Sequence, residues 1–206
     1  MIIALEGLPG AGKTSTAELL AQRLEVQAVC ETTQNHPFLD SVYRDDERHD
    51  LEVELAFLLL HSSAWRAIDR SVVTMTDFSP AKDVLFAEAM LSDPPDKALF
   101  DHAYQRLYEG YRPADVVVYL RARPDLCIER VRKRYEEDEH REFEKDMGVE
   151  RLARMEHFYE HGLPTLGDDV LVLDLDEVLE PTDSESASKD RVVSAVVELL
   201  GSRIHL

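Results

Sequence analysis

The stretch GLPGAGKT, from Gly7 to Thr14, decides how the start of this chain folds. It contains three glycines, of which Gly7 and Gly12 are separated by four residues, and Gly12 is followed by lysine and threonine. Residues 1–7 read as a short buried strand, and residues from about 12 to 24 read as a helix. A glycine loop between a strand and a helix lets consecutive backbone N–H groups converge on phosphate oxygens. The stretch therefore predicts a site for the phosphates of a nucleotide.

The side chains of this loop have separate predicted roles. Lys13 would reach the outer phosphates, and Thr14 would bind Mg²⁺. The loop does not identify the group that receives the terminal phosphate, because water, a side chain, a nucleotide and a small-molecule hydroxyl are all available acceptors. The residues expected to contact the nucleotide are Gly7, Leu8, Pro9, Gly10, Ala11, Gly12, Lys13, Thr14 and Ser15.

Length and composition narrow the class of protein. A chain of 206 residues, 44% of them hydrophobic, is long enough for one buried core, and no segment reads as a linker between domains. We expect no membrane span, because no apolar run approaches roughly 20 residues. We expect no signal peptide, because the N-terminus lacks a basic start and Glu6 interrupts its apolar stretch. The net charge of −19 argues against a nucleic acid polymer as partner. The two cysteines are expected to be reduced thiols of a cytoplasmic protein.

The order of the elements predicts the fold class. Strands alternate with helices, which indicates an α/β fold: a three-layer sandwich around a mostly parallel sheet of five strands. The segment 180–190 is polar and reads as a loose connection. Strands after the first are expected at 27–31, 71–77, 115–120 and 170–175, and helices at 50–69, at 81–110 with a break at 93–95, and at about 191–202.

Acidic residues stand at the ends of two predicted strands. Glu31 closes the strand 27–31, and Asp77 closes the strand 71–77. In parallel sheets, ligands bind beyond the carboxyl ends of the strands. Both acids are therefore expected on the side of the sheet that carries the phosphate loop.

Five stretches, taken in order, resemble the deoxynucleoside kinase family in its bacterial-type branch. The resemblance covers most of the chain, and the ordered set is more specific than the phosphate loop alone. The stretches are IALEGLPGAGKTSTAELLAQRL, E-x-x-x-x-HPFLDSVY from Glu31 to Tyr43, TDFSPAKDVLFAEAML, VVVYLRARPDLCIERVRKR and REFEKDMGVERLARMEHFYE.

This resemblance implies an activity. Family members transfer the γ-phosphoryl group of ATP, with Mg²⁺, to the 5′-hydroxyl of a nucleoside in nucleotide salvage. By position, Glu31 is the base that accepts the hydroxyl proton, Asp77 holds Mg²⁺ opposite Thr14, and Tyr43 contacts the sugar 3′-hydroxyl. The catalytic residues implied by the resemblance are Glu31, Lys13, Arg130 and Arg134.

The resemblance also implies a helical lid and an assembly. The lid would span residues of about 130–147 within a single kinase domain, 1–206. Arg130 and Arg134 lie four residues apart on one helix face, and with Arg141 they would close over the phosphates. Family members commonly pair, so we expect a homodimer, with the helix 50–69 as a candidate face.

Several positions on the substrate side depart from the family pattern. Glu54 and His61 occupy positions where the family usually has a base-reading Gln and an Arg. Phe78 stands where many members carry Arg, although the bacterial-type branch has an aromatic residue there, and His36 replaces an Asn. These changes leave the identity of the accepted nucleoside open. The residues expected around the substrate are Glu31, Tyr43, Glu54, Phe57, His61, Phe78 and Asp83, with Lys82 as a cation nearby.

Three other functions remain open at this point. A thymidylate-kinase-like nucleoside monophosphate kinase needs extra cations for a phosphorylated acceptor, and few occur between Glu31 and Asp77: Arg44, Arg48, Arg66 and Arg70. A non-catalytic ATP-binding regulatory module would account for the altered substrate side. A kinase for a different small alcohol would share the phosphate machinery and differ in its pocket.

Overall fold

A single parallel sheet forms the centre of the molecule. The computed structural model describes residues 1–32, 36–38, 49–137, 148–180 and 182–203. All strand pairings are parallel, and the strand order is β2-β3-β1-β4-β5. The predicted α/β class and five-stranded sheet are confirmed. The strands are β1 (Ile2–Glu6), β2 (Gln27–Val29), β3 (Thr74–Thr76), β4 (Val116–Arg121) and β5 (Val170–Asp174).

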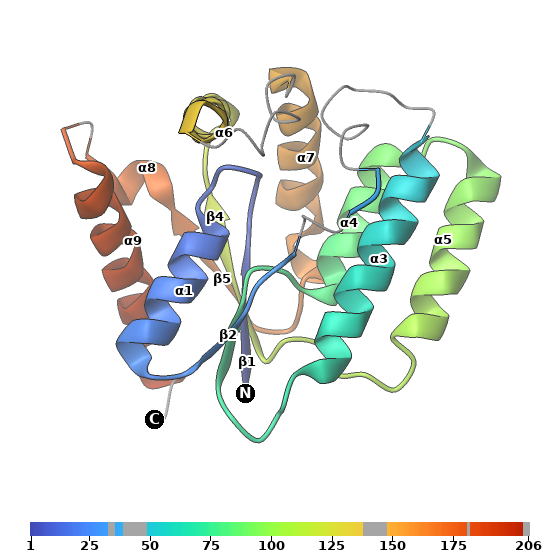
Figure 1. The fold of residues 1–206 in the computed structure, drawn as a ribbon, viewed down its shortest axis with the longest axis horizontal. Helices are drawn as coiled ribbons and strands as arrows, with labels where there is room; N and C mark the ends of the chain where they lie inside the picture. Colours follow the sequence, from blue (N-terminus) through green and yellow to red (C-terminus); the bar gives the residue numbers. More distant parts are fainter. Residues whose placement is uncertain (33–35, 39–48, 138–147, 181, 204–206) are drawn as a thin grey trace.

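Helices cover both faces of this sheet, which completes the three layers. In Figure 1, α1 and α9 lie on one side of the strands, and α3, α4 and α5 lie on the other. The helices are α1 (Lys13–Leu24), α3 (Asp50–Ala67), α4 (Pro80–Met90), α5 (Pro94–Leu107), α6 (Pro124–Glu137), α7 (Val149–Gly162), α8 (Leu175–Val178) and α9 (Glu185–Leu200), with short 3₁₀ turns at Leu163–Thr165 and Gly201–Arg203.

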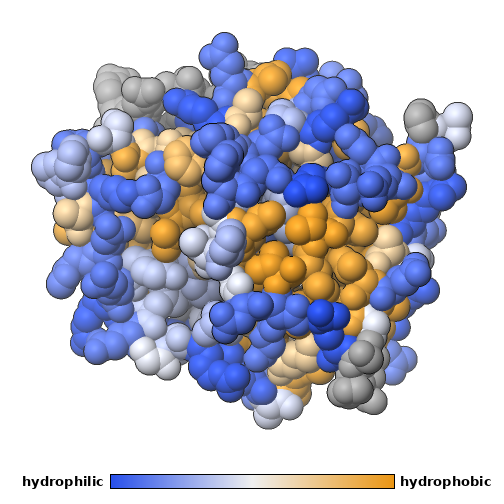
Figure 2. All heavy atoms as spheres, turned by 180° about the vertical axis from the view of Figure 1, so that it is seen from behind, coloured by the Kyte–Doolittle hydropathy of each residue, from blue (hydrophilic) through white to orange (hydrophobic). Residues whose placement is uncertain are grey.

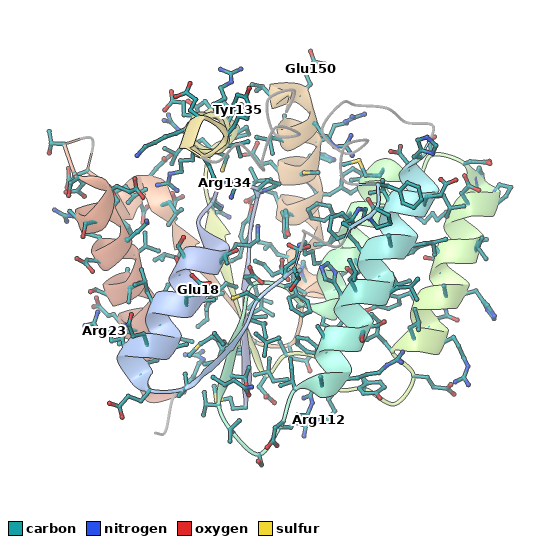
Figure 3. All side chains as sticks on the ribbon, in the orientation of Figure 1. Glu18, Arg23, Arg112, Arg134, Tyr135 and Glu150 are labelled. Carbon is teal, nitrogen blue, oxygen red and sulfur yellow. The ribbon has the colours of Figure 1, made fainter. Side chains whose placement is uncertain are left out.

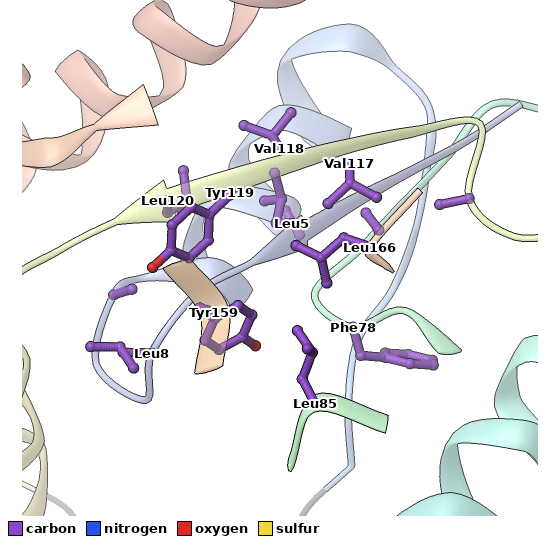
Figure 4. Packing of buried hydrophobic residues seen from close by; sticks show 14 of the residues in the cluster. Leu5, Leu8, Phe78, Leu85, Val117, Val118, Tyr119, Leu120, Tyr159 and Leu166 are labelled. Carbon is purple, nitrogen blue, oxygen red and sulfur yellow. The ribbon is translucent and has the colours of Figure 1, made fainter. Parts of the chain in front are cut away.

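The core lies between the central strands and the helices on either side. All five residues of β1 are buried, as expected for a parallel strand that is covered on both faces. In Figure 4, Tyr119 of β4 lies beside Tyr159 of α7, and their ring centroids are 5.2 Å apart. This contact packs α7 against the sheet close to the strand ends that carry the candidate site.

The surface combines hydrophilic cover with local apolar areas. On the face seen from behind, Figure 2 shows an apolar area bordered by hydrophilic side chains. Two large exposed apolar side chains are Leu59 of α3 and Leu99 of α5. Within the described part of the chain, no helix combines the length and apolar character that crossing a bilayer requires.

Several element boundaries differ from the sequence prediction: β3 spans Thr74–Thr76 instead of 71–77, and the boundaries of β2 and α9 also move. Strand β2 ends at Val29, because it pairs only with β3, and that ladder closes where Val29 meets Thr76. Helix α9 begins at Glu185, so the prediction of a loose segment was wrong for residues 185–190. The side chain of Ser184 accepts a hydrogen bond from Ala187 N at 3.2 Å, which caps the helix.

The cap of α9 gives a test of this boundary. Ser184→Ala should lower the free energy of unfolding by about 1 kcal/mol, because it leaves a backbone N–H of the first turn without its partner. Urea unfolding followed by circular dichroism measures the change. Ser186→Ala, at an exposed position in the same turn, is the matched control. Equal stability of the two variants would contradict the capping role.

Candidate active site

The phosphate loop has the shape that its glycines predict. Gly10 has φ 87°, and a β-carbon there would lie 2.4 Å from the carbonyl oxygen of Cys127 on α6. Gly12 has φ 96° and precedes the first residue of α1. Only glycine adopts these conformations at little cost. The loop thus packs closely against α6 at Gly10, and α1 begins immediately after the loop, at Lys13.

Lys13 folds back over this loop. Its ammonium donates to the carbonyl oxygens of Gly7 at 2.8 Å and Leu8 at 3.1 Å. Burial, and then the nearby charge of Lys82, lower the pKa of Lys13. An anion at this helix N-terminus would meet backbone N–H groups and the lysine together. The nine predicted nucleotide contacts all lie in this loop or the first turn of α1, and their binding role remains a prediction.

Asp77 connects the loop to the neighbouring strand ends. One carboxylate oxygen accepts a hydrogen bond from the hydroxyl of Thr14 at 2.5 Å, and the other accepts from the backbone N–H of Glu31 at 2.6 Å. Because β1, β3 and β2 lie side by side, the segments that follow them meet at one edge. Glu31 therefore lies on the same side of the sheet as the phosphate loop.

Thr14 and Asp77 together present oxygen ligands suited to Mg²⁺. Mg²⁺ commonly takes one or two protein oxygens and completes its shell with substrate phosphates and water. Among the described residues, no group of three or more His, Cys, Asp or Glu side chains could hold a metal ion. Two protein oxygens of this kind fit a Mg²⁺ ion that arrives with a nucleotide.

Two cations hold the carboxylate of Glu31. His61 Nε2 lies 2.8 Å from Oε1, and the ammonium of Lys82 donates to Oε2 at 3.0 Å. Burial alone would raise the pKa of Glu31, but the charge of Lys82 and the hydrogen bond from His61 hold it well below its usual range. Glu31 is therefore a carboxylate at physiological pH, oriented from both sides.

His61 is itself held by a second carboxylate. The Nδ1 of His61 lies 2.5 Å from one carboxylate oxygen of Asp83. The other oxygen of Asp83 accepts a hydrogen bond from the hydroxyl of Tyr108 at 3.0 Å. Burial opposes the charged form, but Asp83 and Glu31 together raise the pKa of His61 to about 9. Both ring nitrogens thus face protein carboxylates, and the expected place of His61 beside the substrate stays a prediction.

The other residues expected around the substrate lie beside this group. Glu54 is buried on α3, and burial followed by the charge of Asp83 raises its pKa to about 8. Phe57 lies against His36, with ring centroids 4.0 Å apart. Phe78 is fully buried, and its ring stacks on the imidazole of His61.

Part of the predicted lid is described. Arg130 of α6 donates to the carbonyl oxygens of Gly10 and Ala11, both at 3.4 Å. Figure 3 shows Arg134 on α6, at the end of the molecule where α7 begins. Tyr43 and Arg141 lie outside the described residues.

Lys82 contacts Glu31 directly, whereas the sequence indicated only a cation near the substrate. Its side chain is buried, and burial opposes its charge, but Glu31, Glu6 and Asp77 raise its pKa above the ordinary value. Lys82 lies in the first turn of α4, where a cation is unfavourable beside the positive end of the helix dipole. That unfavourable position was a signal in the sequence that the lysine has a specific acidic partner.

Comparison with known proteins identifies the family. The profile described as "Deoxynucleoside kinase" matches residues 3–200. The chain belongs to the deoxynucleoside kinase family. The predicted family is thereby confirmed, this member is a kinase, and the alternatives left open by the sequence are not favoured.

Individual members of the family are distant from this chain in sequence. A deoxyguanosine kinase of Bacillus subtilis is 25% identical over 206 residues, which is 96% of this chain and 97% of that protein. A deoxyadenosine kinase of Lactobacillus acidophilus is 27% identical over 145 residues, covering 65% of this chain and 66% of that protein. The structure of a deoxyadenosine kinase from M. mycoides with bound dATP superposes with a TM-score of 0.77 at 20% identity, covering 98% of this chain and 100% of that one.

The close approach of the loop to α6 yields a prediction for nucleotide binding. Gly10→Ala should weaken ATP binding by about tenfold or more, because a β-carbon at this positive φ meets the Cys127 carbonyl and opens the loop. Calorimetric titration with ATP and Mg²⁺ measures the change. Gly167→Ala, whose β-carbon would meet Val117 at an ordinary 3.6 Å, is the control and should bind as the wild type does. Wild-type affinity in Gly10→Ala would refute the role of this contact.

Proposed function

We propose that this chain transfers the γ-phosphoryl group of ATP to the 5′-hydroxyl of a deoxynucleoside. The observation that carries the proposal is the bridge made by Asp77 between Glu31 and Thr14. A hydroxyl held by Glu31 would lie beside the terminal phosphate of a nucleotide in the loop. Family membership and the names of the relatives support the same reaction.

In this proposal the residues position the reactants and balance charge. Glu31 orients the acceptor hydroxyl and takes its proton, since positioning matters more than deprotonation in a loose transition state. Lys13 contacts the phosphates, while Thr14 and Asp77 would hold Mg²⁺. When bound, this ion supplies positive charge to the phosphate oxygens.

The lid and the assembly are part of the proposal. Arg130, Arg134 and Arg141 would close a lid of about residues 130–147 over the phosphates, within one kinase domain that spans residues 1–206. We also propose a homodimer, for which exposed Leu59 on α3 offers apolar contact area. The free cysteines of the described chain, Cys30 and Cys127, suit a cytoplasmic location.

The nucleobase would be read by Glu54, at the position of the family's Gln. A protonated carboxyl both donates and accepts a hydrogen bond, as an amide does, and so matches the N1 and amino group of adenine. An ionised carboxylate only accepts, and so matches the N1–H and amino group of guanine. Glu54 faces Asp83, Asp50, Arg151 and Lys82, and its raised pKa of about 8 places both forms within an accessible pH range.

Glu31 provides the direct test of the reaction. Wild-type enzyme with ATP and Mg²⁺ should phosphorylate at least one deoxynucleoside, and Glu31→Gln should lower kcat by about 10²- to 10⁴-fold, because the amide cannot accept the proton. A coupled assay offers nucleosides and their monophosphates in parallel. Glu18→Gln, on the exposed face of α1, is the matched control. If the enzyme phosphorylated only monophosphates, the proposal would be wrong and the chain would be a nucleoside monophosphate kinase.

If Glu54 reads the nucleobase, the preference of the enzyme between deoxyguanosine and deoxyadenosine should depend on pH. Between about pH 7 and pH 9, the ratio of kcat/KM for deoxyguanosine to that for deoxyadenosine should rise about tenfold as Glu54 loses its proton. In Glu54→Gln the ratio should not change with pH. A ratio between two substrates cancels pH effects that are common to both. A flat wild-type ratio would exclude Glu54 as the group that reads the base.

A further inference from the structure

His61 lies between two carboxylates that belong to different elements. Its Nε2 is 2.8 Å from Glu31, and its Nδ1 is 2.5 Å from Asp83. An ionised carboxylate accepts hydrogen bonds but cannot donate one, so both ring nitrogens must carry protons for both contacts to form. Lys82 also binds Glu31, and Tyr108 also donates to the second oxygen of Asp83, so each acid accepts a further hydrogen bond beside the one from His61. The geometry therefore requires an imidazolium at position 61.

The plane of this imidazolium is fixed by aromatic rings. Phe78 stacks on it at 4.8 Å between ring centroids, with 17° between the planes, and Phe57 lies 5.6 Å away. Only 2% of the surface of His61 is exposed. A ring held in this way cannot turn without breaking a contact to Glu31 or Asp83, so the orientation of His61 is transmitted to Glu31.

We propose that His61, anchored on Asp83, is a positioning residue that holds one oxygen of Glu31 and thereby aims this carboxylate at the acceptor hydroxyl. The inference rests on the proposed function. Each carboxylate oxygen has more than one acceptor site, so a hydrogen bond to His61 leaves room for the substrate. The side chain of Glu31 is 16% exposed, so part of it remains accessible.

The charges that face His61 set the pH range over which it acts. Glu31 follows β2, Asp83 and Lys82 lie on α4, Tyr108 follows α5, and the ring of His36 is close enough for the charge of His61 to affect its pKa. Because the pKa of His61 is raised to about 9, the imidazolium persists at neutral pH and is lost as the pH rises above that value.

Two substitutions separate charge from shape at this position. His61→Gln removes the charge and should lower kcat at saturating deoxynucleoside by about 10- to 100-fold, while the KM for ATP stays unchanged. His61→Arg keeps the charge and the capacity to donate in two directions, so it should restore most of kcat. His102→Gln, at an exposed position on α5, is the matched control and should match the wild type.

The pH profile distinguishes a positioning role from a structural one. Wild-type kcat should fall above about pH 9, whereas His61→Arg should keep its kcat to higher pH because arginine stays protonated. The ¹⁵N shifts of the histidine ring, measured without substrate, should show two protonated nitrogens at pH 7.5 and a titration near the same pH. This spectrum needs no variant to fold and no turnover.

Each result bears on one claim. A neutral His61 ring at pH 7.5, or His61→Gln with wild-type kcat and an unchanged pH profile, would overturn the positioning role. If His61→Gln does not fold, the ring spectrum and the profile of His61→Arg decide. Failure of the wild type to phosphorylate any nucleoside would instead defeat the proposed function, whatever the spectrum shows.

Discussion

The carboxylate of Asp77 holds the two halves of the site together. It accepts hydrogen bonds from Thr14, at the start of α1, and from the backbone of Glu31, beyond the end of β2. Strand β2 is a three-residue edge strand, and Glu31 lies past the end of its ladder. Its backbone therefore needs a restraint that the sheet does not provide. Asp77 supplies this restraint, and through its second oxygen it links the backbone of Glu31 to Thr14. Thr14 and Asp77 are the two residues expected to bind Mg²⁺.

The buried charges at this edge have no simple justification in stability. Removing charged groups from water is costly, and a buried ion pair is often no more stabilising than apolar residues of similar size. Breaking such a pair is nevertheless expensive, at about 3–5 kcal/mol, because one charge is left without its partner. Lys82 also stands at the unfavourable end of a helix dipole. The contacts among Glu31, His61 and Lys82 are therefore better explained by the chemistry of the site than by the needs of the fold.

The fold was predictable where its signals are local. Continuous apolar runs indicated β1 and β4, the glycine spacing indicated the phosphate loop, and the predicted helix 50–69 corresponds to α3 at Asp50–Ala67. The end of β2 was not predictable, because it depends on pairing with a strand far away in the sequence. The start of α9 was missed because a single capping serine lies within a polar segment.

The candidate site was predictable in part, for a related reason. Glu31 and Asp77 could be placed at one edge because parallel strands end together. The contacts of His61 depend on how α3 packs against α4, and no local pattern encodes that register. Lys82 carried a weak signal in its helix position, but its partner became evident only in three dimensions.

The departures from the family pattern are mutually compatible. The phosphate loop acts largely through backbone groups, whereas the substrate side depends on side chains. The aromatic ring of Phe78 stacks on His61. Lys82 supplies a cation to Glu31 from one turn further along the chain. His61, at the position of a family Arg, contacts Asp83. Glu31 is thus held by two cations, Lys82 and His61, although the residues on the substrate side differ from the family pattern.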